Sequence, residues 1–483
     1  MIYRPLFDRA RPGHTVRAGV IGAGNYATAV VTQSASIPRL DVPAMADVDV
    51  GAARQAFLQA GYAEADLAVC ENRKAALKAI EQGRRAVTAD AMLLMDVPLD
   101  VIVEATGAPE AGARHAQAAI AHGKHVAMVN KETDVTVGPA LKALADRAGV
   151  VYTAVDGDQH GLLMGLMDWA RELGLEVLCG GKFRNAEVVL NAAAATATLE
   201  DRARKLDADG MRALGPMPPG QVADIVQARR ALFADRPHIR TSDVGEMAIA
   251  ANATGLLPDV DALHCPVLRA SEVAEAMCPR EDGGMLRQRG AIDAVTCLRR
   301  PSEAGLGGGV FTVVACENAY SRRIMTGKGL APNSRGTASL VYRPYHLCGV
   351  ETAMSILCAG LLGVPTGAAE LLPRVDLVAQ ATADLKAGET LAGDHSPKLK
   401  ALMRPAQPVA SGAPLPFYMA SGNALAVDVP AGEVITADQV VRPAGSVLWG
   451  LRTEQDKQFL GGKMAQWITE NAGIDRGSRD RPE

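Results

Sequence analysis

Short apolar runs alternate with helical segments in the first third of the chain. Buried strands are predicted at 16–21, 42–46, 101–105, 125–129 and 150–155. Helices are predicted between them at 27–36, 50–60, 111–122 and 139–148. Apolar strands that alternate with helices predict an α/β domain built on a doubly wound parallel sheet, which we place at residues 1–155.

The hydrophobic pattern is less regular in residues 156–375. Strand-like runs such as 310–315 alternate with helical runs such as 246–253, and glycine–proline clusters interrupt them. A helix is also predicted at 351–362. This pattern predicts a mixed α+β domain over 156–375.

The pattern changes again at about residue 376. Residues 384–391 (DLKAGETL) and 429–436 (VPAGEVIT) each combine an apolar strand end, a tight Ala-Gly turn and a Glu. They are either an internal repeat or two unrelated hairpins. We predict a small β-rich domain at 376–445 and a tail at 446–483, frayed and charged beyond Gly473.

Composition narrows the function classes. The chain is 48% apolar and 22% charged, which is typical of a soluble globular protein. Its 7 Phe, 3 Trp and 8 Tyr are too few for a base-stacking platform, and its net charge of −4 gives no attraction to phosphate polymers or anionic membranes. We therefore expect neither a nucleic-acid partner nor a membrane partner.

Cysteine usage and the N-terminus indicate the compartment. The eight cysteines are scattered without a CxxC pair, so we expect reduced, mostly buried thiols and no Cys/His zinc site. The first twelve residues are interrupted by charges and prolines and do not form a secretory signal. The apolar stretch 354–364 is too short to span a bilayer. A cytoplasmic location is the expectation.

A glycine motif follows the first predicted strand and opens the first predicted helix. It fits G-x-G-x-x-A and consists of Gly22, Ala23, Gly24, Asn25, Tyr26 and Ala27. The first glycine allows a tight turn, the second lets a pyrophosphate approach the backbone, and Ala27 keeps the helix close to the strand. The motif predicts a Rossmann dinucleotide site, against the alternative of a tight turn without a ligand.

Two further segments bear on the cofactor. Asp47 ends the second predicted strand, about twenty residues after the motif, where a carboxylate can bind the ribose hydroxyls of NAD. No nearby Arg offers a partner for a 2′-phosphate, which favours NAD over NADP. Thr106 and Gly107 follow a later strand and either approach the nicotinamide or simply form a strand-to-helix turn.

Several motifs together resemble homoserine dehydrogenase-like oxidoreductases that carry a C-terminal SAF (β-clip) domain. They are Gly22–Ala27, 123–134 (GKHVAMVNKETD), 156–161 (DGDQHG), 250–256 (AANATGL), 309–311 (GVF), 342–348 (YRPYHLC) and 384–389 (DLKAGE). The resemblance spans about residues 16–445. It implies an NAD(P)-dependent enzyme, similar also to 1-deoxy-D-xylulose 5-phosphate reductoisomerase-like enzymes and to oxidoisomerases of branched sugar acids. It further implies a homo-oligomer and a helix 351–362 that returns to the Rossmann domain.

The sequence departs from this family at two places. His160 stands where the family usually has proline, and the stretch 241–246 (TSDVGE) lacks the family's lysine. Asn130 and Lys131 keep the Asn-Lys pair of homoserine dehydrogenases, which implies a cofactor contact by Asn130.

Hydride transfer requires a group that exchanges the proton of the substrate oxygen. Lys131 after a strand end is the first candidate, Lys182 the second, and His346 a further acid or base, while Arg343 could bind an anionic group. Each has a plain alternative as a solvated loop or surface residue.

Carboxylates supply a possible site for a divalent cation. Its candidate ligands are Asp156, Asp158 and Glu246, although Asp158 could equally cap the helix that follows and Glu246 could serve a helix dipole. His160 is predicted on a polar loop. Asn252 and Thr254 are either satisfied core groups or substrate contacts.

The predicted function is an NAD(P)-dependent oxidoreductase acting on the CH–OH or carbonyl group of a small, hydroxylated and acidic metabolite. Three alternatives remain: a reductoisomerase or oxidoisomerase, a homoserine dehydrogenase, and a nucleotide-binding module without catalysis.

Overall fold

The computed structural model describes residues 2–236, 239–462 and 464–466. Its N-terminal part is a seven-stranded parallel sheet in the order β3-β4-β2-β1-β5-β6-β7, which confirms the doubly wound prediction. The strands are β1 Val16–Ile21, β2 Leu40–Ala46, β3 Leu67–Val69, β4 Arg85–Thr88, β5 Val101–Glu104, β6 His125–Met128 and β7 Tyr152–Ala154. β3 and β4 were not predicted, because both are short and β4 begins at a charged residue.

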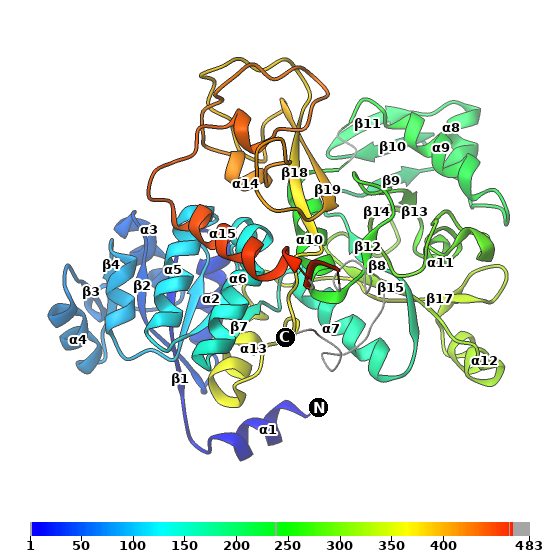
Figure 1. Cartoon of the computed structure of the whole chain (residues 1–483). Coiled ribbons are helices and arrows are strands. Elements are labelled where there is room, and N and C mark those ends of the chain that lie inside the picture. The colour runs from blue at the N-terminus through cyan, green and yellow to red at the C-terminus, as the bar shows by residue number, and fades with distance from the viewer. Residues whose placement is uncertain (1, 237–238, 463, 467–483) are drawn as a thin grey trace.

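Alternate side chains of the central strands enter two separate apolar cores. Val101 and Val103 of β5 join one core, and Ile102 between them joins the other, as the two-residue period of a strand requires. The first core is closed by α2 Asn25–Ser34 and α3 Val50–Gln59. The second is closed by α4 Arg73–Glu81, α5 Pro109–Ala121 and α6 Lys131–Ala148. Helices therefore cover both faces of the sheet (Figure 1).

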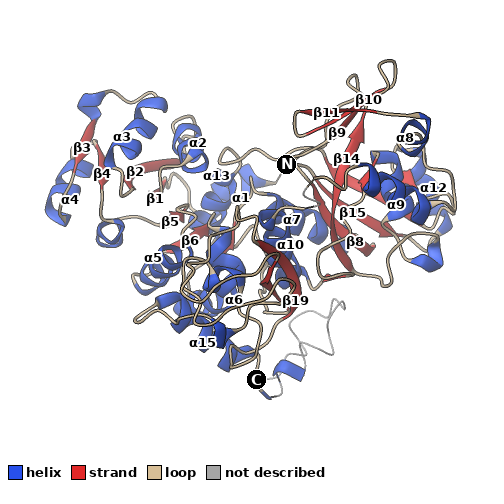
Figure 2. Ribbon diagram, turned by 90° about the horizontal axis from the view of Figure 1, so that it is seen from above, coloured by secondary structure: helices blue, strands red, loops and turns tan. Residues whose placement is uncertain are grey.

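The second large unit is built on a mixed sheet in the order β11-β10-β9-β14-β8-β15-β17-β16, to which β12 and β13 add beside β14. Its strands are β8 Glu176–Phe183, β9 Val188–Asn191, β10 Thr196–Leu199, β11 Arg202–Lys205, β12 Leu257–Pro258, β13 Val267–Leu268, β14 Ala291–Arg299, β15 Val310–Ala315, β16 Ala331–Pro332 and β17 Ala338–Arg343. Its helices are α7 Gln159–Glu172, α8 Ala208–Ala213, α9 Val222–Leu232, α10 Thr241–Thr254, α11 Val273–Ala276 and α12 Ala319–Gly327. α7 and α10 pack against each other and lie between this sheet and the seven-stranded sheet (Figure 2).

The predicted return of the chain to the first unit is present. α13 Thr352–Leu357 continues into a π-helical turn, Cys358–Leu362, and packs on α2 and β1. The N-terminal helix α1 Tyr3–Ala10 contacts this π-helical turn.

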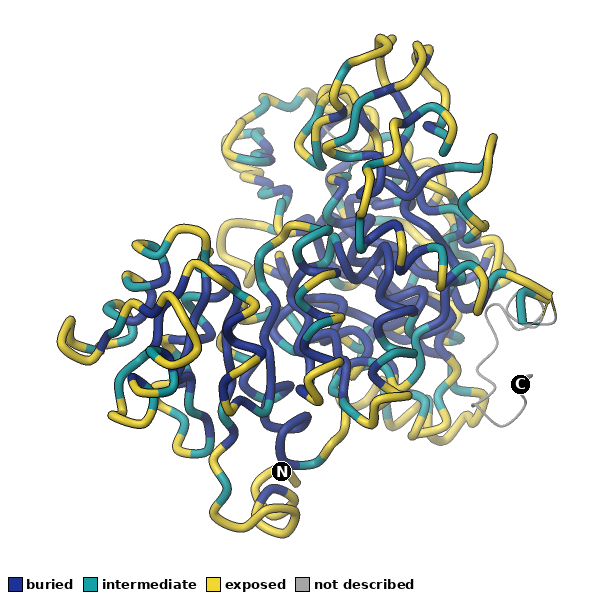
Figure 3. The backbone as a smooth tube through the Cα atoms, turned by 60° about the vertical axis from the view of Figure 1, so that its left-hand side comes forward, coloured by how far each residue is buried: buried dark blue, intermediate teal, exposed yellow. Residues whose placement is uncertain are grey.

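The region 376–445 contains the antiparallel pair β18 Val375–Ala381 and β19 Leu399–Pro405, the short helix α14 Phe417–Ala420 and long loops. The two similar segments lie against each other, because Leu385 and Val429 exchange backbone hydrogen bonds of 2.9 and 3.0 Å. The apolar side chains of this region join the core that covers one face of the seven-stranded sheet. Its loops form the exposed upper end of the molecule, whereas burial concentrates in the elements below (Figure 3).

The prediction of a tail from residue 446 is wrong for its first part. Residues Val447–Phe459 form α15, which packs on α5 and α6. Arg452 on this helix is fully buried and makes a two-pronged ion pair with Asp376, with N–O distances of 2.6 and 2.8 Å. The predicted fraying beyond Gly473 lies outside the described residues.

The cysteines and the longest helices bear on the predicted thiols and on membrane insertion. All eight cysteines are free thiols, and six of them are buried. Within the described ranges, no helix has the length and apolarity needed to cross a bilayer.

Candidate active site

The glycine motif forms the turn between β1 and α2. Gly22 has a φ of +103°, and a Cβ at this position would lie 2.5 Å from the carbonyl oxygen of Ala105. Gly24 is the N-cap of α2, and a Cβ there would meet no atom within 4 Å. Ala27 is fully buried against β1. The loop therefore leaves open space at the helix N-terminus, where a pyrophosphate binds in such folds, and these residues fit a dinucleotide.

Asp47 lies directly after β2 at the same edge of the sheet. Its Oδ1 accepts a hydrogen bond from the backbone N–H of Asp49 at 2.8 Å, and Asp49 caps α3. Asp47 stays partly exposed, so its second carboxylate oxygen can serve a ligand. The preference for NAD remains a prediction.

Thr106, Gly107 and Asn130 form one loop structure at the ends of β5 and β6. The Asn130 side chain caps α6 and donates to Thr106 Oγ1 at 3.2 Å and to the carbonyl of Ala108 at 3.0 Å. Thr106 in turn donates to the buried carboxylate of Glu104 at 2.7 Å. These side chains shape the loop. Gly107, with a φ of +67°, leaves its backbone accessible just beyond β5, the strand that pairs with β1.

Lys131 is the first residue of α6 rather than part of a loop, because this helix begins eight residues before the predicted start at 139. Its Nζ lies 2.7 Å from Oε1 of Glu246 on α10 and 3.5 Å from Oδ2 of Asp158, the N-cap of α7. The other carboxylate oxygen of Glu246 lies 2.5 Å from Nζ of Lys182 on β8. Two lysines predicted as catalytic thus share one carboxylate.

The row of alternating charges continues on the other side of Lys182. Its Nζ lies 2.8 Å from Oδ1 of Asp243, whose Oδ2 lies 3.1 Å from Nε of Arg184. We call the six residues of this row the charge ladder: Arg184, Asp243, Lys182, Glu246, Lys131 and Asp158. Three cations alternate with three anions, so each buried charge has a partner of opposite sign.

The ladder fixes the protonation states of its members. Burial lowers the pKa of Lys131. The attraction of Glu246 and Asp158 raises it by more than burial lowers it, so the pKa lies well above its ordinary value. The same balance, with Glu246 and Asp243 as partners, raises the pKa of Lys182. Burial raises the pKa of Asp158, yet Lys131, His160 and Lys182 outweigh burial and lower it to about 2. Near neutral pH the lysines are ammonium ions and the carboxyl groups are ionised.

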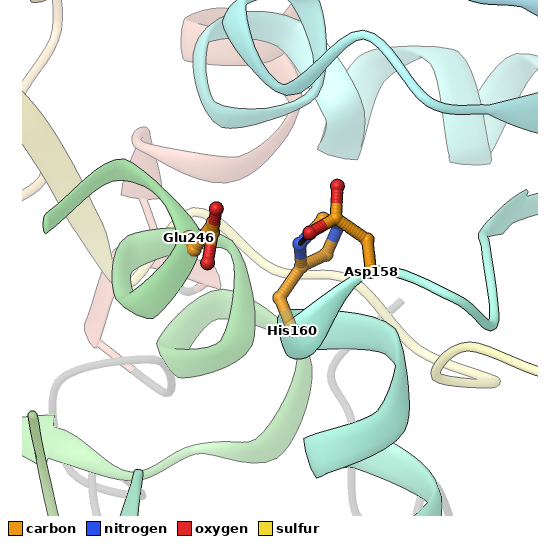
Figure 4. Close-up of side chains that lie close together, drawn as sticks. All are labelled: Asp158, His160 and Glu246. Atoms are coloured by element: carbon orange, nitrogen blue, oxygen red, sulfur yellow. Dashed lines mark ion pairs between the residues drawn. The ribbon is translucent and has the colours of Figure 1, made fainter. Parts of the chain in front are cut away.

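The three carboxylates predicted as ligands of a divalent cation do not all lie together. Potential ligand atoms of Asp158, His160 and Glu246 lie within 4.8 Å of one another (Figure 4). Asp156 is not part of this group; its charge interacts instead with Glu351 and Arg343.

His160 is a buried residue of α7 and not a residue of a polar loop. Its Nδ1 lies 3.8 Å from Oδ1 of Asp158 and has no hydrogen-bond partner among the described residues. An unpartnered imidazole nitrogen beside two carboxylates is a donor set that suits a divalent ion. The ammonium groups of Lys131 and Lys182 compete for the same oxygens.

The segment after β17 holds the remaining candidates. Arg343 is ion-paired with Glu351, and its guanidinium stacks on the ring of Tyr345 at 4.8 Å. His346 Nδ1 lies 2.6 Å from the carbonyl oxygen of Gly308, which can only accept, so Nδ1 carries the proton. In the neutral ring Nε2 is then an acceptor, and it lies 3.1 Å from Sγ of Cys348.

A cavity of about 530 Å³ opens beside the ladder. Its basic lining residues are Lys131, Lys182, Arg184 and Arg240, and its acidic lining residues are Glu187, Glu200, Asp201, Asp243 and Glu246. Arg184 and Asp243 were not predicted. Their signals were available: Asp243 stands three residues before Glu246 on one helix face, and Arg184 follows Lys182 at the spacing of one strand face.

Asn252 and Thr254 are core groups with satisfied hydrogen bonds. The Asn252 amide bonds the backbone of Arg374 and Val375, and the Thr254 hydroxyl donates to the carbonyl of Ala250 at 2.6 Å. The structure therefore supports their interpretation as core groups and not as substrate contacts.

Two family models match parts of the chain. Residues 49–154 match the NAD binding domain of homoserine dehydrogenase, and residues 236–352 match the catalytic domain of oxidoreductase DRL. A comparison with curated proteins gives no match.

Similar solved structures are distant. An oxidoreductase from Agrobacterium radiobacter in complex with NAD+, L-tartaric acid and magnesium is 16% identical, with a TM-score of 0.26 over 35% of this chain and 44% of that one. The 1-deoxy-D-xylulose 5-phosphate reductoisomerase from Zymomonas mobilis in complex with NADPH is 20% identical, with a TM-score of 0.27 over 36% and 46%. A probable dehydrogenase from Thermotoga maritima is 14% identical, with a TM-score of 0.38 over 74% and 91%. The chain thus spans less than half the length of the first two. Two stretches of the chain are thus similar to an NAD-binding domain and to an oxidoreductase catalytic domain.

Proposed function

We propose that the protein is an NAD-dependent oxidoreductase that acts on the CH–OH or carbonyl group of a small, hydroxylated and acidic metabolite. The observation that carries this proposal is the charge ladder. It runs from the nucleotide domain into the second unit, and its lysines line a cavity large enough for a small metabolite.

Lys131 is the group that we assign to the substrate oxygen. Its side chain is 29% exposed, whereas that of Lys182 is 2% exposed, so Lys131 is the lysine that a ligand can reach. Its raised pKa keeps it protonated, and an ammonium group gives a proton to a carbonyl oxygen during reduction and receives it back during oxidation. Glu246 holds this ammonium group in place.

The remaining ladder residues bind and orient. Lys182 positions Glu246 from the opposite side, and Arg184 adds a guanidinium group to the cavity wall for an acidic substrate, whereas Arg240 on the same wall is ion-paired with Glu200. Arg343 contributes less to anion binding than its sequence suggests, because Glu351 already neutralises it.

The glycine loop, Asp47 and the Thr106–Gly107 turn would hold NAD. The bound nicotinamide supplies a hydride acceptor or donor. The protein holds the substrate carbon against that ring, and Lys131 exchanges a proton with the substrate oxygen.

A second candidate function is an oxidoisomerase that couples the redox step to a rearrangement of the carbon skeleton. The unpartnered Nδ1 of His160 beside Asp158 and Glu246 favours it. These three residues would hold a divalent cation, which polarises neighbouring substrate oxygens when bound. EDTA treatment followed by Mg²⁺ or Mn²⁺ titration tests this candidate: loss and recovery of turnover support it, and full activity in metal-free buffer excludes it.

A substrate screen tests the proposed function. Sugar acids, polyols, sugar phosphates and homoserine are each incubated with NAD or NADP, and the absorbance of the reduced nicotinamide is followed. We expect turnover of a hydroxylated acid with NAD and little with homoserine. NAD binding without turnover of any compound would instead indicate a binding module.

A further inference from the structure

A second cavity lies between the mixed-sheet unit and the β18–β19 sheet. Its volume is about 900 Å³, which is within the range of small-molecule sites. α9 and residues 260–267 line one side. Lys400, Leu402 and Arg404 line the other side at the two-residue spacing of one strand face. Among the described residues, Arg184 is the one that lines both this cavity and the cavity beside the ladder.

Basic residues outnumber acidic residues in the lining of the second cavity. Its basic residues are Arg184, Arg230, Arg236, Lys400 and Arg404, and Asp261 is the single acidic residue among its described lining residues. Asp261 pairs with Arg404 at 3.0 Å. Arg236 and Arg184 pair with Asp235 and Asp243, which lie outside the lining of this cavity, and Arg230 donates to the carbonyl of His264 at 2.9 Å. Such a convergence of cations favours a multiply charged oxyanion.

The rest of the lining is mostly apolar. Phe233, Leu199, Val267 and Leu402 are buried side chains that form part of the wall. An inorganic ion would leave this wall in contact with water, whereas a ligand with an apolar or aromatic body would cover it. Charge and wall together specify an organic anion.

We propose that the second cavity is a binding site for a phosphate ester with an apolar or aromatic body. A phosphate dianion matches several guanidinium groups, which bind its oxygens in pairs. The site is distinct from the dinucleotide loop and from the cavity beside the ladder. It does not depend on the proposed reaction.

Arg184 connects this site to the ladder. Its Nε lies 3.1 Å from Asp243, and its Nη1 lies 3.4 Å from the hydroxyl of Thr296, which also lines the second cavity. An anion that draws the guanidinium away from Asp243 alters the field at Lys182. Because Arg184 also lines the candidate active site, it is unsuitable as the test position.

The test is calorimetric titration of the full-length protein with phenyl phosphate, inorganic phosphate and citrate, each in saturating NAD so that the glycine loop is filled. We expect phenyl phosphate to bind more tightly than inorganic phosphate or citrate. The double variant Lys400→Ala/Arg404→Ala should bind phenyl phosphate at least tenfold more weakly. The charge-matched control Lys386→Ala/Lys398→Ala, which changes two lysines outside the cavity lining, should bind within twofold of wild type.

Hydrogen exchange measured by mass spectrometry locates the ligand independently of activity. Phenyl phosphate should slow exchange in 258–267 and 399–405 and leave the NAD-filled glycine loop unchanged. Absence of binding at millimolar concentration, equal affinity in both double variants, or tighter binding of citrate would each overturn the proposal. A retained melting temperature in both double variants excludes misfolding as the cause.

Discussion

Lys131 Nζ and Glu246 Oε1 lie 2.7 Å apart although 115 positions separate the two residues in the chain. Lys131 opens a helix of the nucleotide domain, and Glu246 is buried in the middle of α10. Their contact joins the predicted cofactor site to the unit that would bind the substrate. Under the proposed function, this contact holds the ammonium group that would meet the reacting oxygen.

Replacing Glu246 by Gln should destabilise the protein. The variant keeps the side-chain shape but removes the carboxylate that two lysines share, and breaking a buried ion pair costs about 3–5 kcal/mol. The melting temperature should fall, and the pKa of Lys131 and that of Lys182 should fall with it. Asp428→Asn, which breaks the exposed pair with Lys386, is the control and should leave the melting temperature unchanged. An equal effect of both changes would refute the structural role of the ladder.

The two glycines of the dinucleotide loop should fail in different ways. Gly22→Ala places a methyl group against the carbonyl of Ala105 at a positive φ, so it should lower the melting temperature as well as NAD binding. Gly24→Ala meets no protein atom and should fold normally, yet bind NAD at least tenfold more weakly because the methyl group occupies the pyrophosphate space. Calorimetry with NAD and thermal melts separate the two effects. Normal NAD affinity in Gly24→Ala would place the cofactor elsewhere.

Glu132 should make stability depend on pH. Burial raises its pKa to about 7 from an ordinary value of 4.5, opposed in part by Lys131 and reinforced by Asp394. Because the folded state binds this proton more tightly than the unfolded state, ionisation of Glu132 destabilises the fold progressively between pH 4.5 and 7. Glu132→Gln removes that cost, so its advantage in melting temperature over wild type should be larger at pH 8 than at pH 5. The same difference at both pH values would contradict the assignment.

Cys348 should be the first cysteine to react with iodoacetamide. It is exposed, Cys316 is half-buried, and the other six are buried. Although the residue is exposed, partial desolvation of its sulfur and the nearby Asp158 raise the pKa of Cys348, so its labelling rate should keep rising with pH beyond the range of an ordinary thiol. His346→Gln removes the acceptor of the S–H proton and should slow labelling near neutral pH. Peptide mapping that finds another cysteine labelled first would count against this geometry.

Local signals in the sequence predicted most of the nucleotide domain. Apolar runs gave β1, β2, β5, β6 and β7, and the glycine motif gave the turn at Gly22. α15 was missed although Leu448, Leu451, Gln455 and Phe459 are buried at helical spacing, because polar and charged residues separate these positions and weaken the apolar period.

The candidate site was predicted as separate residues but not as an arrangement. Lys131, Lys182, Glu246 and Asp158 come from four different elements, and no spacing along the chain reveals that they meet. His160 was predicted on a polar loop, whereas its burial beside Asp158 depends on the packing of α7 against α10.

The most direct test is to measure kcat of Lys131 variants of the protein with the substrate that the screen identifies. Turnover is followed at the absorbance of the reduced nicotinamide, with NAD affinity measured in parallel. Lys131→Ala should lose about 10²–10⁴-fold in kcat while binding NAD normally, as expected for removal of a group that exchanges the substrate proton. An unchanged kcat in Lys131→Ala would contradict the central claim.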